Sequence, residues 1–209
     1  MTDGSASRAT LSDKQVEAIR EVAAIAAAQT GNALGRLSRL PVGITSSEVL
    51  TLKLEEIPSL FGGLNAPAIG VLVPFQGDLE GNALLLFPEA GVEALEEVLL
   101  GRDRDGDEDL KLSAFAEIGN ILTGNLLTVL SSLSDRILIS LPPCPVQDMA
   151  GAILDAVLAD IGSATDEVTV LVFNLAASSG GSLVRSVFLP GDAGIELLLE
   201  AAGRLESGS

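Results

Sequence analysis

A glutamate and an asparagine lie three residues apart, Glu117 and Asn120, in a segment that otherwise has the pattern of an apolar helix. At that spacing both side chains lie on one helix face. Neither side chain gains from burial, and asparagine is a mediocre helix former. A carboxylate can pair with a cation, and a carboxamide accepts and donates hydrogen bonds at once. The pair is therefore the best candidate for a functional site in this chain.

Simpler interpretations of both residues stay open at this point. A glutamate on a helix is usually a solvated charge. An asparagine in an apolar helix must find a hydrogen-bond partner, and that partner could be a backbone carbonyl of a paired helix. We expect Gly119 and Gly124 to mark close packing of the helix on a sheet. Ser113 is expected to cap or begin the helix.

The residue types that are missing restrict the possible chemistry. The 209 residues include no histidine and one cysteine, Cys144. This excludes histidine-ligated metals, Ser-His-Asp triads and Cys-His dyads, and we expect no metal site. There is no apolar signal region at the start and no run of 18 apolar residues. We therefore expect a cytoplasmic protein that does not span a membrane.

The charge of the chain is strongly negative. Twelve lysines and arginines stand against 29 aspartates and glutamates, which gives a net charge of −17. Nucleic acids and anionic membranes are bound through basic clusters, so we expect neither as a partner. Few lysines with abundant alanine, glycine and valine are typical of a cytosolic protein from a high-salt organism, where screening tolerates such charge. An ordinary acidic protein is the alternative.

Hydrophobic periodicity and turn residues predict helix, strand, hairpin and helix, and then the same order again. Ser12 with Gln15 forms a capping-box pattern at the start of the first helix. We expect helices over about 13–40, 89–100, 110–133, 149–162 and 192–204, and strands over about 42–54, 68–75, 82–87, 136–141, 168–176 and 182–189. A turn or short helix is expected at 57–65.

The two halves of the chain are similar in sequence. Residues 21–25 (EVAAI) match residues 117–121 (EIGNI) at an offset of 96, and the two hairpins are separated by nearly the same distance. We expect one domain at 11–205, made of repeats at about 11–101 and 110–205 joined by an acidic linker at 102–109. The ends at 1–10 and 206–209 are expected to be tails. The predicted fold is α+β, a pseudo-twofold duplication with a mainly antiparallel sheet covered by helices.

The segment around the pair resembles a known family. Ser113, Glu117, Asn120 and Pro143 satisfy a signature of Asp or Ser, three residues, Glu, two residues, Asn, twenty-two residues and Pro. This signature is similar to that of the CheC-like chemotaxis phosphatases, which include CheX and FliY. The resemblance covers about residues 11–205. In the first half Glu21 is present, but Ala24 replaces the asparagine, Glu17 the Asp or Ser, and Ser47 the proline, so we expect a degenerate first site.

The resemblance implies a phosphatase that acts on the phospho-aspartate of a CheY-type response regulator. Asn120 would orient the attacking water, and Glu117 would dock the regulator's lysine. Ser113 and Pro143 would support the motif. No cofactor is expected on this chain, because the regulator would supply Mg²⁺. The alternative is a non-catalytic module that binds CheY or the receptor deamidase CheD.

Overall fold

The computed structural model describes residues 12–101, 107–161, 168–178, 180–190 and 194–207. The expected tail at 1–10 and most of the expected linker lie outside these residues. The strands are β1 (Val42–Leu52), β2 (Pro67–Gly77), β3 (Gly81–Pro88), β4 (Leu138–Ser140), β5 (Cys144–Met149), β6 (Val168–Ala177) and β7 (Ser182–Pro190). The helices are α1 (Asp13–Ser38), the short 3-10 helix η1 (Leu54–Leu60), α2 (Glu89–Leu99), α3 (Glu108–Ser134), α4 (Ala150–Ile161) and α5 (Gly194–Ser207).

The seven strands form one antiparallel sheet. Its order is β1-β6-β7-β3-β2-β4, and β5 also pairs with β2 along the same edge as β4. Each half of the chain therefore gives its edge strand to the hairpin of the other half: β1 pairs with β6, and β4 and β5 pair with β2. The two hairpins meet at the centre through β3 and β7. The predicted α+β fold with an antiparallel sheet is confirmed.

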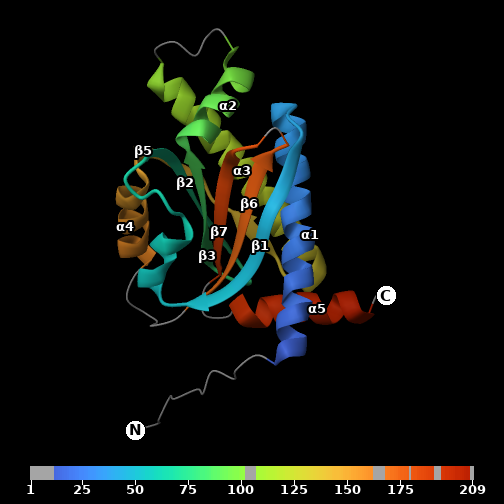
Figure 1. The fold of residues 1–209 in the computed structure, drawn as a ribbon. Coiled ribbons are helices and arrows are strands. Elements are labelled where there is room, and N and C mark those ends of the chain that lie inside the picture. The colour runs from blue at the N-terminus through green and yellow to red at the C-terminus, as the bar shows by residue number, and fades with distance from the viewer. Residues whose placement is uncertain (1–11, 102–106, 162–167, 179, 191–193, 208–209) are drawn as a thin grey trace.

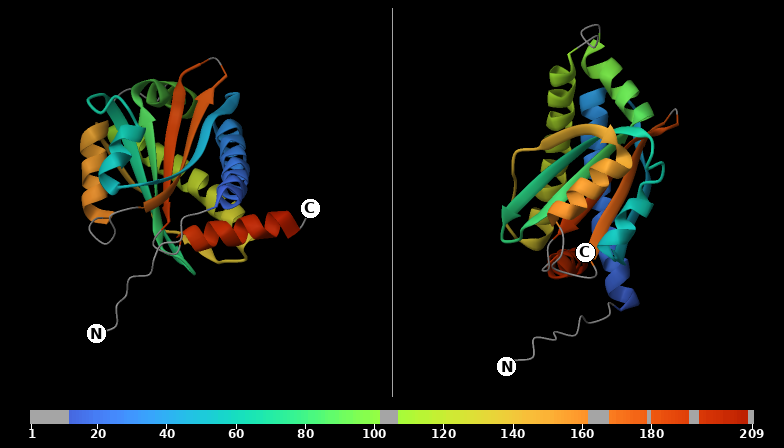
Figure 2. Two further views of the ribbon diagram at one scale, coloured as in Figure 1. Left: turned by 60° about the horizontal axis from the view of Figure 1, so that its bottom comes forward. Right: turned by 90° about the vertical axis from the view of Figure 1, so that its left-hand side faces the viewer.

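Helices cover both faces of the sheet (Figures 1 and 2). The long helices α1 and α3 pack against one face and against each other, and α5 contacts both of them. On the opposite face, α4 and η1 cover a separate core that includes Ile57, Leu84, Leu154 and Val187. The molecule therefore has three layers, with buried hydrophobic clusters on both faces of the sheet, as expected when a sheet buries both of its faces.

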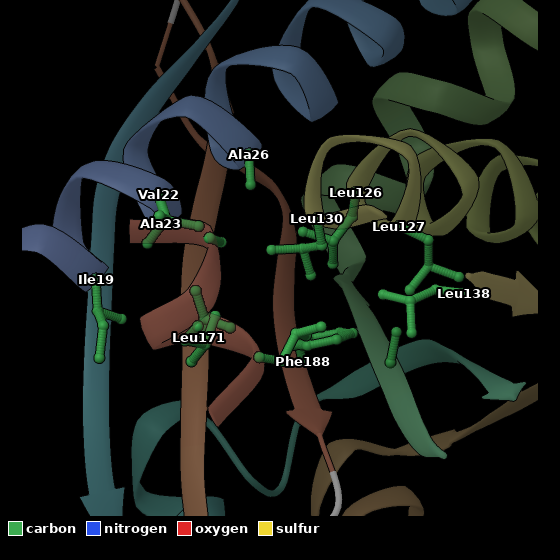
Figure 3. Packing of buried hydrophobic residues seen from close by; sticks show 14 of the residues in the cluster. Ile19, Val22, Ala23, Ala26, Leu126, Leu127, Leu130, Leu138, Leu171 and Phe188 are labelled. Atoms are coloured by element: carbon green, nitrogen blue, oxygen red, sulfur yellow. The ribbon is translucent and has the colours of Figure 1, made fainter. Parts of the chain in front are cut away.

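The core beneath the long helices joins both halves of the chain (Figure 3). Ile19 and Ala26 of α1 and Leu130 of α3 are fully buried there. Beneath them the Phe75 ring of β2 stacks on the Phe188 ring of β7, with centroids 4.8 Å apart. Burying an isoleucine, leucine or phenylalanine side chain contributes about 1.5–3 kcal/mol, so this shared core stabilises the packing of the two halves on each other.

The offset of 96 residues is preserved in detail. Both long helices end at a left-handed residue, Arg39 with φ 56° and Asp135 with φ 59°. The preceding serines are buried and donate to carbonyls four residues back, Ser38 to Leu34 at 2.7 Å and Ser134 to Leu130 at 2.6 Å. Serine in this arrangement satisfies its hydroxyl inside the helix. The duplication is therefore visible in hydrogen bonds as well as in the order of elements.

Several boundaries differ from the sequence-based expectation. The expected strand at 136–141 is shorter, and a second edge strand, β5, follows it at Cys144–Met149. Helix α3 begins at Glu108, two residues inside the expected linker. Helix α5 continues to Ser207, where the Ser207 hydroxyl donates to the Gly203 carbonyl at 2.8 Å. The capping box of Ser12 and Gln15 is confirmed.

An arginine–glutamate pair attaches α5 to the segment that follows α3. Arg136 donates through Nε and Nη2 to the two carboxylate oxygens of Glu200, at 2.8 and 2.5 Å. These hydrogen bonds lower the pKa of Glu200 below its ordinary value. A carboxyl group whose pKa is lowered by folding stabilises the fold above its unfolded pKa, and the contribution is lost as the pH falls through the folded pKa.

We predict that Glu200→Gln lowers the free energy of unfolding at neutral pH and that this deficit shrinks below about pH 4.5, the ordinary carboxyl pKa. Urea unfolding followed by circular dichroism across the acid range measures it, since the chain has no tryptophan or tyrosine. Glu97→Gln, at an exposed position of α2, is the matched control. A deficit in Glu200→Gln that stays constant with pH would contradict the linkage.

Candidate functional site

The inner face of α3 determines which side chains point outward. Phe115, Ile118 and Leu122 are buried against the sheet. The Phe115 ring meets Phe87 of β3 edge to face, with centroids 5.0 Å apart, a favourable aromatic geometry. Between them, a Cβ at Gly119 would lie 2.5 Å from Val71 Cγ1 of β2. The helix therefore sits close to the sheet at the centre of the motif, as predicted for Gly119.

The opposite side of the same turns carries the candidate residues. Glu117 is exposed and Asn120 is partly buried. Gly124, one turn after Asn120, has no atom within 4 Å of the position that a Cβ would occupy. The prediction that Gly124 packs against the sheet is therefore wrong: it leaves bare helix surface beside Asn120. A partner could approach the amide closely at this point.

Asn120 has one weak hydrogen-bond partner among the described residues. The Ser140 hydroxyl of β4 donates to Asn120 Oδ1 at 3.5 Å, which is longer than a normal O–H···O hydrogen bond. Among the described residues, the Asn120 amide forms no hydrogen bond with a backbone carbonyl of α1. The alternative that Asn120 bonds to a paired helix is therefore not realised. Asn125, by comparison, donates to the Ile121 carbonyl of its own helix at 2.7 Å. The Asn120 amide is therefore available to another molecule.

Ser140 was not identified from the sequence, because it lies twenty residues from Asn120 on a separate strand. Its position depends on the break between β4 and β5. Leu141 donates its backbone N–H to the Pro74 carbonyl at 2.8 Å, and Pro142 and Pro143, which have no N–H group, then interrupt the pairing. Pro143 is partly buried. The Pro142–Pro143 pair thus separates β4, which carries Ser140, from β5.

Ser113 does not cap the helix. The N-cap is Asp107, whose side chain accepts a hydrogen bond from the Leu110 N–H at 3.0 Å. A carboxylate at this position also interacts favourably with the positive end of the helix dipole, so α3 begins five residues before Ser113. Ser113 is exposed, one turn before Glu117 on the same helix face.

The corresponding positions in the first half carry different chemistry. Glu21 and Ala24 are both exposed on α1. At the same offset, the counterpart of Ser140 is Ile44, which is 40% exposed. Thr45 of β1 forms a bulge at the position equivalent to Leu141. At these positions the first half carries Ala24 and Ile44 in place of the amide of Asn120 and the hydroxyl of Ser140.

The electrostatic surroundings of the pair are simple. Glu117 makes no ion pair with another described residue, so its carboxylate faces solvent without a cation of this chain beside it. Within the described ranges, no three acidic or cysteine side chains converge as a metal site. None of the helices in those ranges has the length and apolar content that crossing a membrane requires. The arrangement offers an exposed acid, an amide and an open helix surface.

Comparisons with known proteins find similar sequences and folds among chemotaxis proteins. Residues 69–156 match the family described as chemotaxis phosphatase CheX. The CheY-P phosphatase CheC of Bacillus subtilis (strain 168) is 27% identical over 166 residues, covering 77% of this chain and 79% of that protein. FliY of Thermotoga maritima has a TM-score of 0.70 at 18% identity, covering 96% of this chain and 100% of that one.

A complex of CheX with CheY, BeF3 and Mg²⁺ from Borrelia burgdorferi has a TM-score of 0.50 at 14% identity, covering 84% of this chain and 97% of that one. The structural likenesses show a shared fold. The sequence matches support the resemblance of the chain to the CheC-like chemotaxis phosphatases.

Two glycines of α3 provide a test of how the helix is oriented. We predict that Gly124→Ala raises the free energy of unfolding by about 0.5–1 kcal/mol, because alanine is the better helix former and its methyl group meets open space. Gly119→Ala should lower it by about 1–3 kcal/mol, since its methyl group collides with Val71. Chemical unfolding of both variants measures the difference. Equal effects would mean that α3 does not present Asn120 outward.

Proposed function

We propose that this CheC-like protein dephosphorylates the phospho-aspartate of a CheY-type response regulator. The observation that supports the proposal is the outward, weakly bonded Asn120 amide beside Glu117, in register with the family signature. The relative named CheY-P phosphatase and the CheX–CheY complex make a response regulator the expected partner. With this partner the protein would act in the cytoplasm.

In the proposed reaction Asn120 holds the attacking water. The carboxamide accepts a hydrogen bond from water through Oδ1 and donates one through Nδ2, so it can orient the oxygen in line with phosphorus. The water oxygen forms a bond to phosphorus while the bond to the aspartyl oxygen breaks. The aspartate carboxylate leaves, one proton of the water passes to solvent, and inorganic phosphate is released. No covalent intermediate on this chain is needed.

Glu117 has a docking role in this proposal. It lies one turn before Asn120 and is exposed, so its carboxylate can pair with the regulator's active-site lysine and fix the register of the two proteins. Bare helix at Gly124 allows the regulator to approach from the other side of Asn120. We propose that the regulator supplies Mg²⁺ to neutralise the charge on the phosphoryl group.

A second candidate is a module that binds CheY or the deamidase CheD without catalysis. The sequence of the first half favours it, because Ala24 stands at the position where catalysis would need an asparagine. The candidates differ in whether phosphate release depends on Asn120. Binding alone would leave the lifetime of the acyl phosphate unchanged.

We predict that Asn120→Ala reduces phosphatase activity about a hundredfold while binding of the regulator is largely kept, because one oriented water contributes a few kcal/mol to the barrier. The assay follows decay of a phosphorylated regulator freed of its phosphodonor. Glu117→Ala should raise KM more than it lowers kcat, since its role is docking. Its matched control, Glu21→Ala in the first half, should have little effect.

Two outcomes would contradict parts of this proposal. Unchanged decay of the acyl phosphate alongside measurable binding would rule out the enzyme and favour the binding module. Equal losses from Glu21→Ala and Glu117→Ala would show that the first half also docks a regulator.

We also propose that the protein operates at high salt. Only 12 lysines and arginines balance the 29 aspartates and glutamates, which leaves a net charge of −17. Ion pairs such as Arg20–Glu17 and Arg204–Asp135 are exposed. Exposed pairs contribute little, so self-repulsion is left to screening by salt.

We predict that the free energy of unfolding rises between about 0.1 and 1 M KCl, over which the Debye length falls from about 10 to 3 Å. Urea unfolding at each salt concentration measures the change. Because screening is nearly complete at the upper end, most of the gain should occur below about 1 M. Equal stability in low and molar KCl would count against the proposal.

A further inference from the structure

A cavity lies on the sheet face opposite α3. Its volume is about 390 Å³, and its walls include the buried side chains of Phe61, Ala68, Leu86 and Ala150. These residues come from the segment after η1, from β2 and β3, and from the first residue of α4. Small-molecule sites are mostly apolar cavities of roughly 300–1,000 Å³ with a few polar groups. The cavity has the size and lining of such a site.

Arg185 of β7 provides the charge in this lining. Its side chain is partly buried, and its Nη1 donates to the Leu60 carbonyl. No described carboxylate forms an ion pair with it, although the chain has 29 aspartates and glutamates. A guanidinium has five N–H donors, so most of them remain for another group. These N–H donors can bind an anion that enters the cavity.

The rim of the cavity is open main chain. Gly62 and Gly63 both adopt left-handed φ angles, 61° and 58°, which side chains rarely tolerate. A Cβ at Gly62 would meet no atom within 4 Å. On the other side, the Ser182 hydroxyl donates to Asn174 Oδ1 at 2.7 Å, so the proton of this hydroxyl is already used. Arg185 is therefore the group that would recognise a ligand.

We propose that this cavity binds a small monocarboxylate with an apolar body. The carboxylate would form a bidentate pair with the Arg185 guanidinium, the geometry that arginine favours. The hydrocarbon part would lie against Phe61 and Leu86. A single arginine in an apolar cavity matches one negative charge, whereas a phosphate group would need more donors. This site is separate from the Glu117–Asn120 face and does not depend on the phosphatase proposal.

Isothermal titration calorimetry with hexanoate, and with hexan-1-ol as the neutral analogue, tests the proposal. Hexanoate should bind saturably and at least ten times more tightly than the alcohol. Arg185→Gln should remove this tenfold preference. Because Arg185 also bonds to Leu60 and its replacement could loosen η1, Ala66→Phe provides a second variant: Ala66 is exposed at the cavity wall, and the larger ring should block both ligands.

Asn120→Ala serves as the control. Asn120 belongs to the helix that covers the other sheet face, so this variant should bind hexanoate as the unchanged protein does. The net charge of −17 disfavours unspecific uptake of anions, so a saturable signal reports the cavity. Equal binding of acid and alcohol would overturn the role of Arg185. Absence of hexanoate binding, or binding that survives Ala66→Phe, would overturn the site itself.

Discussion

The contact between Gly119 of α3 and Val71 of β2 is the constraint on which the site depends. A methyl group at Gly119 would lie 2.5 Å from Val71 Cγ1, so the helix backbone rests almost directly on the sheet. Phe115 and Leu122 fix the turns on either side. Each residue step turns a helix by about 100°, so rotating α3 by one position would carry Asn120 toward the core. Close packing in the interior thus sets the position of a polar group on the surface.

The exchange of edge strands explains why the second half needs the first, although the first half has Ala24 where the second has Asn120. Helix α3 and Asn120 belong to the second half, whereas Val71, on which the helix rests, belongs to the first half. Strand β4 reaches Asn120 because it pairs with β2 of the first half, through contacts such as Phe75 with Ser140. The first half can therefore lack the candidate residues and still be required as the scaffold.

Much of the fold follows from patterns along the sequence, because helical periodicity and glycine-rich turns are local signals. Strand β5 was missed because Pro143 and Pro145 argue against a strand. It exists because it is an edge strand, where a residue without an N–H group is tolerated. Gly119 and Gly124 look alike in sequence, yet one contacts the sheet and the other faces solvent. Their difference and the Ser140 contact depend on tertiary structure, which spacing alone does not encode.

The charge of the chain restricts which partner the proposed site would accept. A surface with a net charge of −17 repels an acidic protein over about one Debye length. Glu117 adds to that repulsion unless a cation lies opposite it, because no cation of a described residue pairs with it. Salt at molar concentration shortens the screening length to about 3 Å. This removes the long-range repulsion between the two proteins but weakens an ion pair in direct contact much less. Under those conditions Glu117 would discriminate by contact: a regulator with a lysine in register would dock, and one without it would leave a carboxylate unpaired beside the amide.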